Sequence, residues 1–157
     1  MSKTPSDRRA RSSAARIYAV QALFQMEAAG QSAERVRDEF ETWRIAAPLD
    51  GETTPEADEA LFSAVLDNAV TWQARIDQMT DRALVAKWKI DRIDPVLRAL
   101  FRAAGAELVA AKTPPRVVIK EYVMVAEAFS SDGKEPRFVN AVLDHMAREA
   151  RPEAFEG

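Results

Sequence analysis

The chain has 157 residues with 47% hydrophobic and 30% charged side chains, a composition typical of one globular domain. It has no cysteine, which excludes disulfides, thiolate metal sites and cysteine nucleophiles. The formal net charge of −3 is small, and no apolar run is long enough to span a bilayer. We therefore expect a cytoplasmic globular protein without membrane contact.

The first pattern along the chain is a basic amphipathic helix. It is expected to run from an N-cap at Ser6 to Ala29, with Gly30 as its stop. Residues 1–20 carry five basic side chains and one acidic one, so this end is suited to an anionic polymer, unless it is merely a solvated basic end. Residues 1–7 are predicted to form a flexible basic arm. The apolar face of the helix is expected to hold Ala10, Ala14, Ile17, Val20, Phe24 and Ala28.

Two further helical patterns follow, separated by turn residues. The first is predicted from a cap at Ser32 to about Arg44, with three residues inward: Val36, Phe40 and Trp43. The stretch from Pro48 to Thr54 is predicted to be a loop. One long helix is then expected from an N-cap at Thr54, followed by Pro55, since apolar residues recur at helical spacing at Phe62, Val65, Ala69, Trp72, Ile76 and Met79. A short helix should follow from Thr80 to Trp88.

The last third of the sequence predicts three more helices. Asp94 and Pro95 begin the first, and its inner residues are Leu97, Phe101, Ala104 and Leu108. The second begins at Pro114-Pro115 and carries the stripe Val118, Tyr122, Val125 and Phe129. A turn over Ser130–Gly133 leads to the third, with Pro136 in its first turn and the stripe Phe138, Val139, Val142, Leu143 and Met146. The chain is therefore predicted to be all-α, with residues 151–157 as a loose tail.

The sequence lacks the patterns of an enzyme. The five glycines are scattered, His145 is the only histidine, and no nucleophile motif accompanies it. Glu107 and Glu121 flank apolar stripes, where carboxylates more often accept structural hydrogen bonds or contact a partner than carry out acid–base chemistry. We expect no catalytic residue, no metal site and no cofactor.

Four segments together resemble the NusB family of bacterial transcription antitermination factors. The most specific are VVIKEYVMVAEAF at 117–129 and EPRFVNAVLD at 135–144. The others are Ala15-Arg16 followed by AVQALFQ, and LRALFRAAGAEL at 97–108. This sequence departs from the family pattern in having Lys120 where asparagine is usual and Ala141 where glycine is common.

The resemblance implies both a fold and a function. The fold would be a NusB-like bundle of about seven helices in two packed sub-bundles, with residues 8–150 forming a single RNA-binding domain. The function would be antitermination through single-stranded boxA RNA of nascent ribosomal transcripts. The partners would be NusE, the ribosomal small-subunit protein that also acts in transcription, and the transcription elongation complex. A helical protein–protein adaptor that binds no RNA is the alternative.

Site residues follow from the same resemblance. Arg16 matches the family directly, and the other N-terminal arginines match as a displaced cluster. The expected RNA-binding set is Arg8, Arg9, Arg11, Arg16, Arg137, Phe138 and Asn140, in which cations neutralise phosphates and the aromatic ring stacks on a base. Phe138 lies at the margin of its apolar stripe, so core packing remains the alternative for this residue. Expected partner contacts are Arg102, Glu107 and Glu121.

Overall fold

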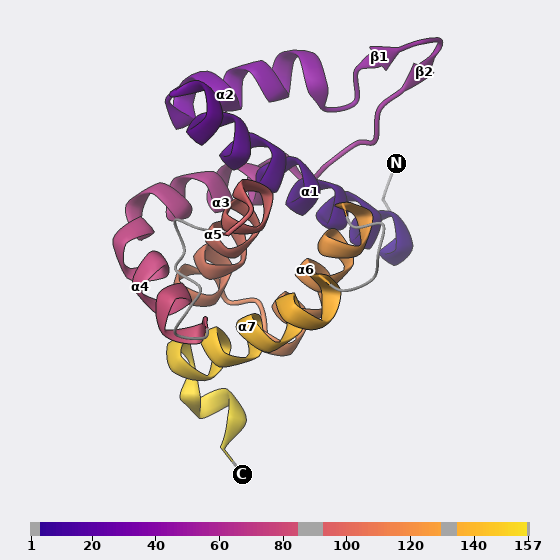
Figure 1. Cartoon of the computed structure of the whole chain (residues 1–157). Coiled ribbons are helices and arrows are strands. Elements are labelled where there is room, and N and C mark those ends of the chain that lie inside the picture. The colour runs from indigo at the N-terminus through magenta and orange to yellow at the C-terminus, as the bar shows by residue number, and fades with distance from the viewer. Residues whose placement is uncertain (1–3, 85–92, 130–134, 157) are drawn as a thin grey trace.

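The structure, a computed structural model, describes residues 4–84, 93–129 and 135–156 (Figure 1). These residues form seven α-helices: α1 (Pro5–Ala29), α2 (Ala33–Glu39), α3 (Glu59–Thr71), α4 (Gln73–Ala83), α5 (Pro95–Ala110), α6 (Pro115–Phe129) and α7 (Glu135–Ala150). Shorter elements are the π-helical turn η1 (Phe40–Arg44), the strands β1 (Pro48–Leu49) and β2 (Glu52–Thr53), and the 3-10 helix η3 (Pro152–Phe155). The predicted all-α class is confirmed. No helix in these ranges is long and apolar enough to cross a membrane.

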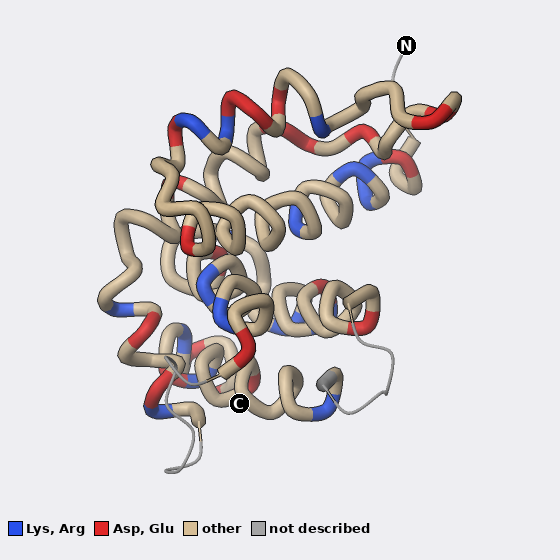
Figure 2. The backbone as a smooth tube through the Cα atoms, turned by 45° about the horizontal axis from the view of Figure 1, so that its top comes forward, with Lys and Arg blue, Asp and Glu red and all other residues tan. Residues whose placement is uncertain are grey.

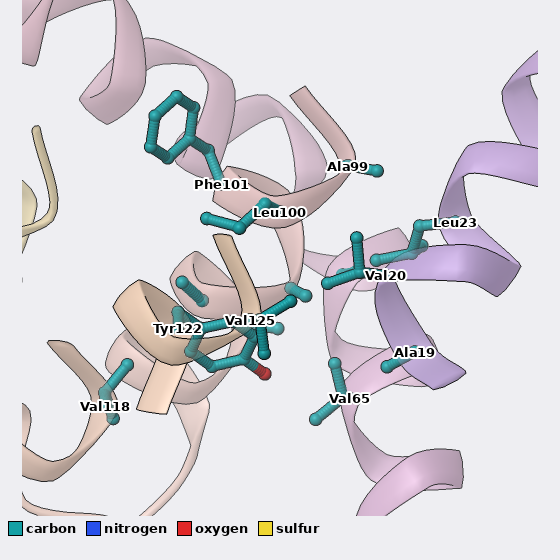
Figure 3. Close-up of a cluster of buried hydrophobic side chains, with 14 of the residues drawn as sticks. Ala19, Val20, Leu23, Val65, Ala99, Leu100, Phe101, Val118, Tyr122 and Val125 are labelled. Carbon is teal, nitrogen blue, oxygen red and sulfur yellow. The ribbon is translucent and has the colours of Figure 1, made fainter. Parts of the chain in front are cut away.

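Helix α5 is the shared element of two sub-bundles. It packs against five other helices: α1, α3, α4, α6 and α7. Figure 3 shows the centre of this arrangement, where Val20 of α1, Leu100 of α5 and Tyr122 of α6 converge. Each large aliphatic side chain buried there contributes roughly 1.5–3 kcal/mol relative to exposure. The apolar stripes of helices distant in sequence thus share one core.

Helix α1 begins earlier than predicted and is packed on a different face. Thr4, not Ser6, is the N-cap: its hydroxyl accepts from the Asp7 N–H at 3.0 Å, and the Asp7 carboxylate accepts from the Thr4 N–H at 3.3 Å. Residues 5–7 are therefore helical, which corrects the expected flexible arm at these positions. The helix ends at Gly30 in the left-handed conformation, as predicted. The buried apolar residues of α1 are Ala15, Tyr18, Ala19, Val20, Ala22 and Leu23, whereas Ala10, Phe24 and Ala28 are exposed.

A π-helical turn changes the direction of side chains after α2. The Ile45 N–H donates to the Phe40 carbonyl at 2.8 Å, so five residues occupy a turn that an α-helix closes with four. Phe40 stays buried as predicted, but Trp43 is 73% exposed and the prediction for it is wrong. The expected loop at 48–54 contains a hairpin of β1 and β2, whose turn has Asp50 at φ 50° and Gly51 at φ 83°.

The long helix predicted after Pro55 is two helices. Helix α3 starts at an Asp58 cap, whose carboxylate accepts from the Leu61 N–H at 3.0 Å. The break lies at Trp72, which is 39% exposed, contrary to its predicted place in the stripe. The other five stripe residues are buried as predicted: Phe62, Val65, Ala69, Ile76 and Met79. Thr80 continues α4, and Trp88 lies outside the described residues.

Glycine at position 105 allows α4 to approach α5. A Cβ atom at Gly105 would lie 2.4 Å from Cγ2 of Ile76, a branched side chain that has little freedom to move. We expect Gly105→Ala to lower the free energy of unfolding by about 1–2 kcal/mol, because overpacking of about 1–3 kcal/mol exceeds the gain in helix propensity of at most about 1 kcal/mol. The shift in denaturant midpoint measures this. The loss should shrink when Ile76 is already alanine, and a raised midpoint in Gly105→Ala would contradict the close contact.

The end of the chain is folded onto the domain, which corrects the loose tail expected over 151–155. Arg151 donates from Nε to the Leu108 carbonyl at 2.9 Å and from Nη2 to the Glu107 carbonyl at 2.8 Å. The guanidinium carbons of Arg116 and Arg148 lie 5.3 Å and 4.5 Å from the centre of the Phe155 ring. These contacts attach η3 to α5, α6 and α7.

Candidate nucleic-acid interface

The basic end of α1 is a helical surface. Arg8 and Arg9 are exposed in its first turns, and the capping box of Thr4 holds those turns in place. Arg11 is half-buried and donates from Nη2 to the Ala57 carbonyl at 3.3 Å. Figure 2 shows basic positions grouped at the N-terminal end of α1. The cations of this end are therefore held on a helix next to solvent, where phosphates can reach them.

The start of α7 presents two polar side chains and turns one aromatic ring inward. Arg137 and Asn140, three residues apart, lie on the same side of the helix and both are exposed. Phe138 is half-buried and packs edge-to-face against Phe101, with ring centres 6.2 Å apart and an interplanar angle of 64°. This geometry favours the packing alternative for Phe138. Arg137 and Asn140 are then the exposed groups of this part of the EPRFVNAVLD segment.

The fold brings the N-terminal turns of α1 and the start of α7 to the same side of the molecule. Ser13 of α1 donates its hydroxyl to Glu121 of α6 at 3.1 Å, and α6 in turn packs along α7. Figures 1 and 2 both show the N-terminal end of α1 on the same side as the end of α6 and the start of α7. Arg9 and Arg137 are more than 120 residues apart in sequence. The helix ends that carry them nevertheless lie on the same side of the molecule.

Arg16 is an internal residue, which corrects its expected RNA contact. Its guanidinium donates from Nε to Oε2 of Glu107 at 2.8 Å and from Nη2 to Oε1 at 3.0 Å. Arg16 is 5% exposed and Glu107 is 1% exposed. The same carboxylate accepts from the Tyr122 hydroxyl at 2.6 Å and from the Thr113 hydroxyl at 3.2 Å. A guanidinium held this way cannot reach a phosphate in the folded protein.

The electrostatics of this buried cluster fix its protonation. Burial by itself lowers the pKa of Arg16, but the hydrogen bonds and charge of Glu107 outweigh it, and the pKa is raised. Burial, with the charge of Glu107 next in size, raises the pKa of Tyr122 well above its ordinary value. Arg16 thus stays charged and Tyr122 stays a neutral donor. The cluster joins α1, α5 and α6 by charge-assisted hydrogen bonds.

The residues expected to contact a partner all have bonds inside the domain; only Glu107 is fully buried, and a partner contact of Arg102 or Glu121 stays a prediction. Glu107 is buried in the cluster just described, and Glu121 accepts from Ser13 and lies 3.7 Å from Nη1 of Arg16. Arg102 donates from Nε and Nη2 to the two carboxylate oxygens of Asp77 at 3.0 and 2.9 Å, and from Nη1 to Glu27 at 3.2 Å. All three side chains hold helices together.

An apolar groove that the sequence did not indicate lies along the exposed side of α1. It has a volume of about 460 Å³ and is lined by residues that include Val20, Gln21, Phe24, Val96 and Phe129. Phe24 is 37% exposed and Phe129 is 44% exposed, although both occupy predicted core stripes. Their spacing does not distinguish them from core residues, because each lies one turn from a buried neighbour. An exposed pair of aromatic rings in a groove is a surface suited to a protein partner.

Comparisons with known proteins agree with this architecture. The NusB family model matches residues 13–148. A transcription antitermination protein NusB of Maricaulis maris is 44% identical, over 98% of this chain and 96% of its own. One of Granulibacter bethesdensis is 45% identical, over 92% of this chain and 91% of its own.

Solved structures of NusB proteins are similar in fold to this chain. T. maritima NusB superposes with a TM-score of 0.73 at 27% identity, covering 99% of this chain and all of that one. A crystal structure of antitermination factors NusB and NusE in complex with dsRNA gives a TM-score of 0.69 at 25% identity, covering 87% of this chain and 96% of that one. Since the family match and the similar sequences extend over nearly the whole chain, the protein belongs to the NusB family.

Proposed function

We propose that this chain is a transcription antitermination factor that binds boxA RNA of nascent ribosomal transcripts together with NusE. The observation that carries the proposal is the basic surface made by the N-terminal turns of α1 and the start of α7, in the fold of the NusB family. A solved complex of NusB and NusE with dsRNA, similar in fold to this chain, supports the RNA and the partner.

The RNA surface has two parts with different chemistry. Arg8, Arg9 and Arg11 neutralise phosphates, and their helix holds them at fixed spacing. Arg137 adds a cation at the start of α7, and the Asn140 amide, a donor and an acceptor, faces the edge of an unstacked base. The Phe138 ring, packed on Phe101, holds this first turn of α7 in place. The net charge of −3 on the whole chain discourages binding of RNA elsewhere.

The apolar groove beside Phe24 and Phe129 is the surface that we assign to the protein partner NusE. It lies on α1, the same helix that carries the basic turns, so RNA and NusE bind side by side on one rigid element. The complex then acts on the transcription elongation complex in the cytoplasm. The protein has a binding role with no catalytic residue and no cofactor in this proposal.

The salt dependence of RNA binding tests the basic surface. The logarithm of the affinity for a short boxA-type single-stranded RNA should fall with log salt by about 0.7 per phosphate contact. Replacing Arg8, Arg9 and Arg11 together with glutamine should flatten that slope by about 2, with a small loss in melting temperature because Arg11 no longer donates to the Ala57 carbonyl. Anisotropy titrations at several salt concentrations, with and without NusE, measure both quantities.

A matched triple variant removes three exposed cations elsewhere: Arg35 of α2, Arg75 of α4 and Lys112 before α6. It has the same net charge as the first variant and should keep the slope of the unaltered protein. Equal slopes in the two variants would remove α1 from the site. If the unaltered protein retains no RNA even with NusE present, the adaptor alternative replaces the proposal.

A further inference from the structure

A second groove, between α6 and α7, has a volume of about 450 Å³, which lies within the roughly 300–1,000 Å³ of small-ligand sites. Helix α7 contributes Asn140 and Asp144 to its wall, and α6 contributes Arg116, Ile119, Lys120, Val123, Met124 and Glu127. We propose that this groove binds one unstacked nucleotide of the RNA, with Lys120 on its phosphate and Asn140 on the edge of its base. The inference rests on the proposed function and assigns a nucleotide subsite within it.

The groove continues a surface that already belongs to the proposed RNA interface. On α7, Arg137, Asn140 and Asp144 are spaced by three and four residues and therefore share one face. Arg137 stands at the start of this face, and the two residues after it line the groove. A strand of RNA bound at Arg137 thus enters the groove without leaving α7.

The groove contains the groups that a nucleotide requires. The Lys120 ammonium is exposed and acts as a point charge for a phosphate. The Asn140 amide both donates and accepts, so it can pair with a base edge. The Asp144 carboxylate is held by Nε of Arg148 at 2.9 Å and has a second oxygen with which to accept from an amino group of a base. Val123 and Met124 supply apolar contact for the face of the ring.

The surface between this groove and α1 favours RNA as the occupant. Glu121, next to Lys120 in sequence, contacts Ser13 of α1. At about 100° per residue, Val117 and Met124 lie on α6 between the directions of Lys120 and Glu121. They are 41% and 48% exposed. This exposed apolar strip has Lys120 on one side and, beyond Glu121, the basic end of α1 on the other. Such a surface matches a single strand whose phosphates pair with cations while its bases cover apolar side chains.

Three single variants test the subsite against a short boxA-type single-stranded RNA. Lys120→Met should flatten the salt slope by about 0.7. Asn140→Ala should weaken binding about three- to tenfold at every salt concentration without changing the slope, because it removes neutral hydrogen bonds. Arg35→Met, which removes an exposed charge on α2, is the control and should bind like the unaltered protein. All three positions are exposed, so the melting temperature should stay constant.

A series of RNAs with one abasic position each identifies the bound base. One of them should lose as much affinity as Asn140→Ala does, and combining the two changes should add no further loss. If Lys120→Met and Asn140→Ala bind RNA like the control, the subsite is overturned while RNA binding itself stands. If they weaken binding of NusE and not of RNA, the groove is a protein contact and the subsite is again overturned. An unaltered protein that binds no RNA with NusE present removes the proposed function and the subsite together.

Discussion

Replacing Glu107 with alanine is expected to lower the free energy of unfolding by about 3–5 kcal/mol, as when one partner of a buried ion pair is removed. The Glu107 carboxylate is the common acceptor for Arg16, Thr113 and Tyr122. Without it, the guanidinium of Arg16, itself 5% exposed, keeps its charge but loses both hydrogen bonds where water cannot replace them. A denaturant titration measures the loss as a lower midpoint at an unchanged slope.

Two further variants separate the ion pair from a general loss of charge. Glu34→Ala removes an exposed carboxylate from α2 and should change stability by less than about 0.5 kcal/mol. Combining Arg16→Met with Glu107→Gln should restore part of the stability, because no buried charge remains and Tyr122 keeps an acceptor. This double variant should also keep its RNA affinity. Restored stability with lost RNA binding would return Arg16 to the interface.

Phe138→Ala is expected to lower the free energy of unfolding by about 2–4 kcal/mol. Fully buried phenylalanines lose about 3–5 kcal/mol on truncation, and this ring is only half-buried, so we expect a loss about 1 kcal/mol smaller. The variant loses the edge-to-face contact with Phe101 and leaves a gap between α5 and α7. Thermal melting measures the loss of stability. An RNA titration of the same variant, at a temperature where it remains folded, measures its affinity for RNA.

The neighbouring residue supplies the control for Phe138. Arg137→Ala should show the opposite result, with stability changed by less than about 0.5 kcal/mol and a salt slope flatter by about 0.7. A Phe138→Ala variant that melts normally but binds RNA more weakly would show that the ring stacks on a base instead of packing on α5.

Helix ends were predictable where a single local signal acted. Asp94 and Pro95 begin α5, and the Asp94 carboxylate accepts from the Val96 N–H at 2.7 Å. Gly30 ends α1 in the left-handed conformation. Where two signals competed, the sequence did not decide: Thr4 caps α1 instead of Ser6, and Asp58 caps α3 instead of Thr54. Thr54 instead accepts from the Ala47 N–H at 2.8 Å and so closes the loop around the hairpin.

Side-chain direction was less predictable than helix position. Trp43 and Trp72 fit apolar stripes by spacing, yet a π-helical turn exposes the first and a break between α3 and α4 exposes the second. A periodicity argument assumes an uninterrupted helix, so it fails at these residues.

The sequence by itself determined the all-α class, most helix positions and the resemblance to the NusB family, because caps, prolines and helical periodicity act within one or two turns. Only the tertiary structure decided which charged side chains are exposed and which are buried. Arg16 looks like the other N-terminal arginines in sequence, but its partner Glu107 lies 91 residues away. Likewise, Lys120 and Asn140 form a groove only because α6 and α7 pack together. Whether a charged side chain is buried, and which partner it pairs with, depends on which helix faces meet. Only long-range packing determines which faces meet.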